Sequence, residues 1–140
     1  MEYIEPKYKL VAVLNKKIEI GRAMNALAHM AVGIGGSTKS NLLRLQDYHD
    51  ADGEKHPSIS DIPFIVLRAN SSQIQKLREI AKAESFLFTN FTDTMLGETY
   101  VDQHAKTSLT KAEDLQYFGI CLFGESKKVS KITRKFSLYR

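Results

Sequence analysis

Short apolar runs and segments of helical periodicity alternate along this sequence, with polar turns between them. Continuous apolar runs rich in β-branched and aromatic residues predict strands with buried positions. Four such runs occur, at residues 8–15, 63–69, 86–91 and 115–124, and a shorter one at 41–46 predicts an edge strand. The run at 115–124 is the longest, so we expect it at the centre of a sheet.

Residues 20–32 are predicted to form a helix. Apolar residues recur there at helical spacing, at Ala23, Met24, Leu27, Met30 and Ala31. Glycines follow at positions 33, 35 and 36. Glycine often ends a helix because it adopts left-handed backbone without steric cost, so the glycines are predicted to end this one.

Three further segments are predicted to be helical. Residues 70–84 carry an apolar stripe, and Ser72 with Gln75 has the spacing of a capping box. Residues 94–113 are expected to be helical in part, and residues 126–136 are expected to form a short helix.

Strands that alternate with helices predict an α/β protein with a mostly parallel or mixed sheet, formed as one domain over residues 1–140. The single cysteine, Cys121, stands in a predicted strand, which indicates a buried thiol and suits a reducing compartment. The first residues have no signal-peptide core, and no apolar run approaches the length of a membrane span. We therefore expect a cytoplasmic protein that does not cross a membrane.

Charge is distributed unevenly, although the net charge is only +4. After Glu125 there is no acidic residue, and six lysines and arginines follow it. A second basic group lies near the start of the chain, at Lys7, Lys9, Lys16, Lys17 and Arg22. If the two groups meet in the fold, they form a positive face suited to phosphate or nucleic acid; otherwise they are solvated lysines that keep the protein soluble.

The stretch GIGGSTKS, residues 33–40, nearly spells a phosphate-binding P-loop. A P-loop lies between a strand and the start of a helix, where backbone N–H groups and the helix dipole meet the phosphates. This stretch instead follows a predicted helix, and Thr38 replaces the second glycine of the motif. The sequence therefore predicts a helix end with a connecting loop, and no P-loop.

The other end of the same helix is the strand-to-helix junction that an anion site needs. It begins near Gly21, and Arg22, Asn25 and His29 follow at spacings that place them on one stripe. A cation in a first turn opposes the helix dipole unless it faces an anion. This conflict indicates a functional site, whereas the alternative is an exposed polar face.

Other candidate chemistry is weaker. The segment DYHDADGEKH holds His49, His56 and several carboxylates, but its spacing fits neither a calcium loop nor a zinc helix. It is predicted to be a polar loop with a tight turn at Asp52 and Gly53. His104 is predicted to lie at the surface. We expect no metal and no cofactor.

Two segments carry a family resemblance. KLVAVLNKKIEIGRAMNALAHMAVG and YFGICLFGESKKVSKITRKFSLYR resemble the opening and the end of the type-2 peptidyl-tRNA hydrolase family, with Gly21 and His29 at matching positions. DADGEKHPSISDIPFIVLRA, NFTDT and the final SLYR resemble a sister group of the same fold, the uncharacterised family called domain of unknown function 2000. The resemblance implies a three-layer α/β/α domain with a mixed sheet of about four strands, and a homodimer.

The sequence departs from the hydrolase pattern at positions that matter for catalysis. Arg22 stands where that family has a lysine, and Ala26 replaces a glutamine. The acidic position at the end of the third strand aligns with Asn90, with Asp93 and Thr94 nearby. Asparagine cannot act as a carboxylate base, and arginine does not readily give up a proton.

Three functions follow as hypotheses. The first is a cleft for a phosphate-bearing small molecule or tRNA, built from Gly21, Arg22, Asn25, Asn90 and Thr94. The second is a hydrolase of a peptidyl-tRNA-like ester in which His29 or Asp93 orients water. The third is a non-catalytic, dimeric interaction module.

Overall fold

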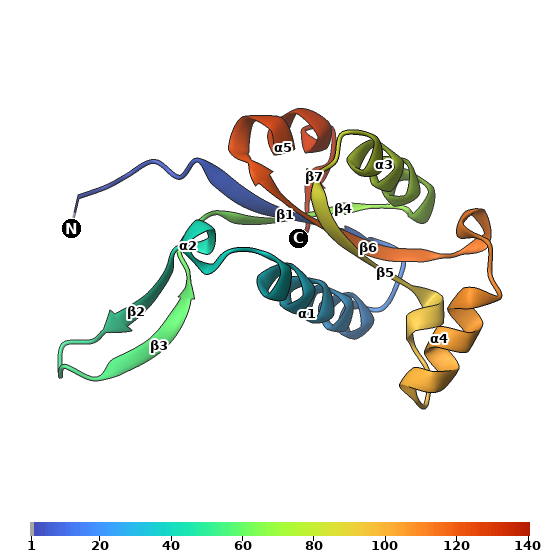
Figure 1. Cartoon of the computed structure of the whole chain (residues 1–140), viewed down its shortest axis with the longest axis horizontal. Coiled ribbons are helices and arrows are strands. Elements are labelled where there is room, and N and C mark those ends of the chain that lie inside the picture. Colours follow the sequence, from blue (N-terminus) through green and yellow to red (C-terminus); the bar gives the residue numbers. More distant parts are fainter. Residues whose placement is uncertain (1) are drawn as a thin grey trace.

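A mixed sheet of five strands forms the centre of the computed structural model, which describes residues 2–140 (Figure 1). The strand order is β5-β6-β1-β4-β7, in which only the β1–β4 pair is parallel. The strands are β1 (Tyr8–Asn15), β4 (Phe64–Ala69), β5 (Leu87–Thr92), β6 (Tyr117–Glu125) and β7 (Ser137–Leu138).

Helices lie against both faces of this sheet (Figure 1). Helix α1 (Ile20–Ser37) packs on the face that holds Leu10, Ala12 and Leu14 of β1. Helices α3 (Ser71–Ala83) and α5 (Ser126–Thr133) pack on the face that holds Val11 and Val13. Successive side chains of β1 are therefore buried on opposite sides, which explains its unbroken apolar run.

The remaining elements lie outside this core. They are α2 (Ser40–Leu43), β2 (Leu45–His49), β3 (Lys55–Ser60), α4 (Tyr100–Ser108) and two short 3₁₀ turns, η1 (Asp93–Met95) and η2 (Ala112–Asp114). Strands β2 and β3 pair only with each other and project from the body as a hairpin (Figure 1). Across residues 2–140, every helix is too short or too polar to traverse a lipid bilayer.

The four predicted strands are confirmed, and the longest one lies inside the sheet. Strand β6 is flanked by β5 and β1, and its residues from Tyr117 to Phe123 are buried. The two-residue strand β7 adds a fifth member to a sheet predicted to have about four. Cys121 is buried as predicted, and desolvation raises the pKa of its thiol to about 12.

The predicted end of the first helix is wrong. Helix α1 continues through all three glycines to Ser37, and Thr38 follows as its C-cap. Gly33 lies against β5 so closely that a Cβ there would stand 2.9 Å from Thr89 Cγ2. Packing against the sheet thus compensates for the roughly 1 kcal/mol that a glycine costs in a helix. Because residues 33–37 are helical, GIGGSTKS does not form a phosphate-binding loop.

The burial pattern of α1 also differs from the prediction. Its buried residues are Ala23, Ala26, Met30 and Ile34, whereas Met24 is 62% exposed. The capping box of α3 is likewise displaced by two residues. It is formed by Asn70 and Gln73 instead of Ser72 and Gln75, because the helix begins at Ser71.

The segment from residue 41 to residue 60 differs most from the prediction. Only Leu45 and Gln46 of the expected edge strand at 41–46 are in a strand, β2. The residues before them form a helical turn that buries Leu43, followed by Arg44 in left-handed backbone at φ 52°. The turn at Asp52 and Gly53 is confirmed, with Gly53 at φ 81°. Strand β3 was not predicted because nearly all its residues are exposed and it has no apolar alternation. The last predicted helix ends at Thr133 and not at residue 136.

Candidate functional site

A cleft of about 480 Å³ opens between α1, the end of β5 and the segment that leads into α4. Its walls come from elements distant in sequence. The lining residues are Asn25, His29, Met30, Thr89, Asn90, Phe91, Met95, Leu96, Gly97 and Gln103.

Strand β5 fixes one wall of the cleft by contacts to α1. The Thr89 hydroxyl donates a hydrogen bond of 2.9 Å to the backbone carbonyl of Met30. Two residues along the strand, the buried Phe91 stacks with His29 at 5.8 Å between ring centroids and 28° between planes. Since alternate residues of a strand share a face, Thr89 and Phe91 both meet α1.

His29 is free to interact with a ligand. Its side chain is exposed, and within residues 2–140 no hydrogen bond or ion pair to its imidazole is found. Among the described residues that line the cleft, His29 alone carries an imidazole, and the other side chains are amides, a hydroxyl or apolar groups. Both ring nitrogens are therefore open to a substrate, water or phosphate.

Only some of the site residues predicted on α1 line the cleft. Asn25 and His29 line it, whereas Gly21 and Arg22 do not. Arg22 is exposed in the first turn, one turn before Asn25 on the same side of the helix. A Cβ built on Gly21 would meet no atom within 4 Å, so the start of the helix is open to solvent.

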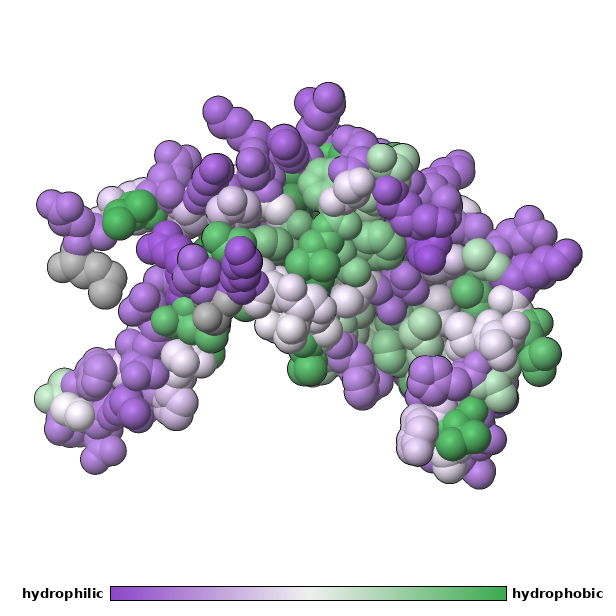
Figure 2. Space-filling view, in the orientation of Figure 1, coloured by the Kyte–Doolittle hydropathy of each residue, from purple (hydrophilic) through white to green (hydrophobic). Residues whose placement is uncertain are grey.

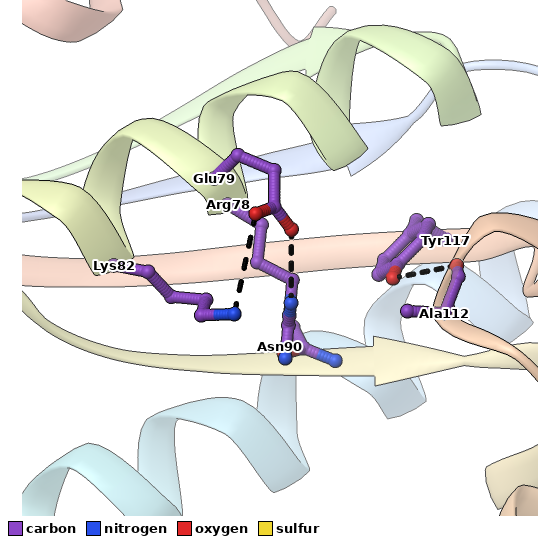
Figure 3. Close-up of polar contacts among 6 residues, drawn as sticks. All are labelled: Arg78, Glu79, Lys82, Asn90, Ala112 and Tyr117. Atoms are coloured by element: carbon purple, nitrogen blue, oxygen red, sulfur yellow. Dashed lines mark hydrogen bonds and ion pairs between the residues drawn. The ribbon is translucent and has the colours of Figure 1, made fainter.

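Asn90 is one of the lining residues of the cleft, but its side-chain oxygen is engaged on the other face of the sheet. Its Oδ1 accepts a hydrogen bond of 3.0 Å from Arg78 Nε of α3, on the opposite face of the sheet (Figure 3). Arg78 is held in turn by Glu79, at 3.2 Å from Nη1 to Oε1. Asn90 lies one residue out of phase with Thr89 and Phe91, so strand alternation accounts for this orientation.

Asp93 and Thr94 act as structural connections next to the cleft. Asp93 binds Gln116 twice, because its backbone N–H donates to the Gln116 carbonyl at 3.0 Å and its Oδ1 accepts from the Gln116 N–H at 3.1 Å. The Thr94 hydroxyl lies 2.9 Å from that of Thr107 in α4. Neither residue lines the cleft, and within residues 2–140 no hydrogen bond or ion pair joins Asp93 to His29.

Several lining residues were not predicted from the sequence. Met95, Leu96 and Gln103 come from the segment expected to be only partly helical. The start of α4 could have been predicted from Thr99, because threonine is a common N-cap residue. Its side chain caps the helix by accepting a hydrogen bond of 3.2 Å from the Asp102 N–H. The side chain of Gln103 is held toward the cleft segment by a 3.4 Å hydrogen bond to the Gly97 carbonyl.

The two basic groups meet only in part. Lys7 and Lys9 lie beside α5, where the Lys7 carbonyl accepts from the Ser126 N–H at 2.8 Å and the Lys9 ammonium donates to the Ser130 hydroxyl. Lys16, Lys17 and Arg22 follow at the other end of β1. The condition for one positive face is therefore met by Lys7 and Lys9 but not by Lys16, Lys17 and Arg22, and the basic tail lies on the other side of the sheet from the cleft.

One histidine of the hairpin, His56, stabilises a turn. His56 Nε2 lies 2.9 Å from Asp50 Oδ2, and the backbone N–H groups of Asp52 and Glu54 donate to Asp50 Oδ1. The hydrogen bond from His56 is the main cause that lowers the pKa of Asp50. Across residues 2–140, no three His, Cys, Asp or Glu side chains converge as a metal site would require.

These observations define the class of protein: a mixed α/β fold with an open cleft beside helix α1. Residues 8–140 match the family described as Protein of unknown function (DUF2000), and the chain belongs to that family. It is similar to a solved structure of a protein of unknown function, Atu0240 from Agrobacterium tumefaciens strain C58. The two share 18% sequence identity with a TM-score of 0.81, over 96% of this chain and 98% of the other. No curated protein matches the chain.

Proposed function

We propose that the cleft beside His29 binds a phosphate-bearing ligand, either a nucleotide or the end of an RNA strand such as tRNA. The observation that carries the proposal is the exposed His29, stacked on Phe91 next to Asn25, with Arg22 one further turn along the same helix. In this arrangement the base of the ligand stacks on the ring of His29. Its phosphate lies at the start of α1, near Arg22.

The two ends of the proposed site suit different parts of such a ligand. Met30, Phe91 and Leu96 supply apolar surface, while the amides of Asn25 and Gln103 supply donors and acceptors for a base edge. Stacking of a base on an aromatic side chain contributes about 1–3 kcal/mol. This combination favours a ring with polar edges over a purely apolar ligand.

The start of α1 is suited to the phosphate. The N-cap Glu19 makes no side-chain cap, and α1 has no acidic residue in its first turn. Unpaired N–H groups and the positive end of the helix dipole attract an anion there, and Arg22 adds a full charge. Arg22 and His29 are seven positions apart, which is about 10 Å along the helix, a length that one or two nucleotides cover.

Replacing Arg22 with alanine is expected to weaken binding of labelled tRNA or AMP by about 10- to 100-fold, because a charge-assisted contact contributes roughly 1.5–3 kcal/mol. Fluorescence titration of the wild type and the variant at several salt concentrations measures this. Lys128→Ala, on the exposed basic surface of α5, is the matched control and is expected to bind like the wild type. Weak, salt-insensitive binding that is equal in all three proteins would contradict the proposal.

Hydrolysis of a peptidyl-tRNA-like ester is the second candidate, because the unengaged imidazole of His29 can accept a proton from an attacking water. Asp93 does not orient this imidazole, since its carboxylate is bound to Gln116. If the cleft is catalytic, His29→Ala is expected to lower the rate of ester cleavage by about 10²-fold or more, whereas His104→Ala leaves it unchanged. Equal rates for both variants and the wild type would exclude His29 as the base.

The remaining expectations follow from the resemblance and the fold. We propose a single domain with the three-layer arrangement of type-2 peptidyl-tRNA hydrolases, supported by α1 on one face of the sheet and α3 and α5 on the other. Arg22 and Ala26, where that family has lysine and glutamine, favour ligand binding over efficient ester hydrolysis. A cytoplasmic location suits the single buried thiol. The third candidate, a dimeric interaction module, depends on whether two copies pair.

A further inference from the structure

One edge of the central sheet is open. Strand β5 runs between α3 and α1, and within residues 2–140 it pairs only with β6, which lies behind it in the view of Figure 3. Figure 2 shows that apolar and intermediate side chains prevail over the middle of this face of the molecule. Exposed edge strands are usually protected by charged side chains, by proline or by being very short. The other edge strand, β7, has two residues, whereas β5 has six, LFTNFT, with no charge and no proline. The edge of β5 is therefore unprotected against pairing with a further strand.

The register of the sheet shows which backbone groups face this edge. Leu10 and Lys16 donate their N–H groups to carbonyls at the two ends of β4, so the odd-numbered residues of β1 face β6. Those residues pair with even-numbered residues of β6. The odd-numbered residues of β6 therefore face β5, where they pair with its odd-numbered residues. Phe88 and Asn90 thus turn their backbone N–H and C=O groups outward, and within residues 2–140 no hydrogen bond to these groups is found.

Small residues on α1 leave space beside this edge. Gly33 contacts β5, and Gly36, three positions further on, lies near the same side of the helix. A Cβ built on Gly36 would meet no atom within 4 Å. On the other side of the strand, Arg78 of α3 lies over the ring of Phe88 and binds the side chain of Asn90. The two helices therefore flank the outward backbone groups without occupying them.

A second pocket, of about 410 Å³, lies at the start of the same strand. It forms because β5 begins at Leu87, opposite Phe123, whereas β6 continues for two more residues to Glu125. Ser85, in left-handed backbone at φ 57°, turns the chain away before it can pair with them. Phe86, Leu87 and Phe123 give the pocket an apolar lining. A strand that extends along the edge of β5 therefore ends in a pocket suited to an apolar side chain.

The charges around this second pocket favour an anion. Lys128 and Lys131 of α5 line it, and Lys131 makes no ion pair within residues 2–140. Of the two lining carboxylates, Glu125 lies 4.0 Å from Lys128, and Glu84 is exposed to solvent. Residues 126–140 carry six lysines and arginines and no acidic residue, so the surroundings are positive.

We propose that the edge of β5 binds the C-terminal segment of another protein as an added antiparallel strand, whose terminal carboxylate lies beside Lys131. The outward groups of Phe88 and Asn90 supply the main-chain hydrogen bonds, and the second pocket holds the last, apolar side chain. An antiparallel strand has its C-terminus at the start of β5, where the lysines attract a carboxylate. A parallel strand would bring its positive N-terminus there instead, and the lysines would repel it.

This proposal does not depend on the ligand of the cleft, and nuclear magnetic resonance of the backbone amides without nucleotide tests it. The probe is a peptide of alternating threonine and valine that is acetylated at its start and ends in valine with a free carboxylate. Main-chain hydrogen bonds supply most of the affinity in this mode of binding, so a generic sequence is sufficient. Hydrogen exchange at Phe88 and Asn90 is expected to slow as the peptide is added. Exchange at Thr89 and Phe91, whose N–H groups face β6, is expected to stay unchanged.

A second comparison tests the terminal carboxylate. Amidation of the peptide, or Lys131→Ala in the protein, is expected to weaken binding about tenfold, because either change removes a charge-assisted contact. The two changes together are expected to weaken it no further than one alone. Lys127→Ala is the matched control, since this lysine is also exposed on α5 but does not line the second pocket. Unchanged circular dichroism is expected to show that both variants fold.

Three results would overturn the proposal. The first is the absence of any change at Phe88 and Asn90 with the peptide at millimolar concentration. The second is binding that neither amidation nor Lys131→Ala weakens, because the carboxylate then has no role. The third is slowed exchange of the same two amides in the protein alone as its concentration rises, which would show that a second copy takes the edge instead of a peptide.

Discussion

Replacing Asn15 with leucine is expected to lower the free energy of unfolding by about 2–4 kcal/mol, since the buried backbone groups that Asn15 satisfies lose their partner. Asn15 is 1% exposed at the end of β1. Its Nδ2 donates to the Tyr117 carbonyl at 2.9 Å, and its Oδ1 accepts from the Lys17 N–H at 2.8 Å. Leucine is of comparable size but makes neither hydrogen bond. Equilibrium unfolding in urea of the wild type and the variant measures how much free energy of unfolding is lost with the two bonds.

Two further variants make this prediction specific. Asn41→Leu changes an exposed asparagine and is expected to alter stability by less than about 0.5 kcal/mol. Asn15→Asp is expected to be destabilising at neutral pH, where a carboxylate oxygen would face the Tyr117 carbonyl, and less so at acid pH, where the protonated group can donate. A fully stable Asn15→Leu protein would show that the β1–α1 connection is held by other contacts.

Replacing Gly119 with valine is expected to cost about 2–3 kcal/mol through overpacking. A Cβ at this position of β6 would lie 2.7 Å from Met30 Cε, 3.0 Å from Leu14 Cδ2 and 3.3 Å from the Val13 carbonyl. Because Met30 also lines the cleft, the strain is expected to displace α1 and to weaken ligand binding along with stability.

A second substitution distinguishes the clash between residue 119 and Met30 from a general distortion of strand β6. Met30→Ala removes the nearest atoms, so combining it with Gly119→Val is expected to destabilise the protein less than the sum of the two single changes. Unfolding of all three variants in urea gives the interaction free energy. Strict additivity would contradict the contact between Gly119 and Met30.

The sequence was sufficient to predict the main strands of the sheet because two neighbouring strands inside it are buried on both faces. Strands such as β1 and β6 then appear as unbroken apolar runs. Strand β3 could not be predicted in this way, since its exposed residues follow no apolar pattern. The length of α1 was missed because Gly33 is required for close packing on Thr89, a contact that local propensity does not reveal.

The sequence predicted which residues line the cleft only on α1, where helical spacing alone decides the side on which a side chain lies. The spacing of Asn25 and His29 placed both on one side of α1, and both line the cleft. The orientation of Asn90 depends on strand register, because a shift of one residue turns every side chain to the other face. The attachment of Asp93 to Gln116 joins residues 23 positions apart and depends on the tertiary fold.

Nuclear magnetic resonance of the histidine side chains tests the proposed binding site most directly. The chain has four histidines, of which His49 and His56 lie in the hairpin of β2 and β3 and His104 lies in α4. On titration with AMP or a short RNA, the resonances of His29 are expected to shift in a saturable manner, while those of His49 and His56 remain unchanged. Titration that leaves His29 unmoved, or that shifts only the other histidines, would contradict a phosphate-ligand site in this cleft.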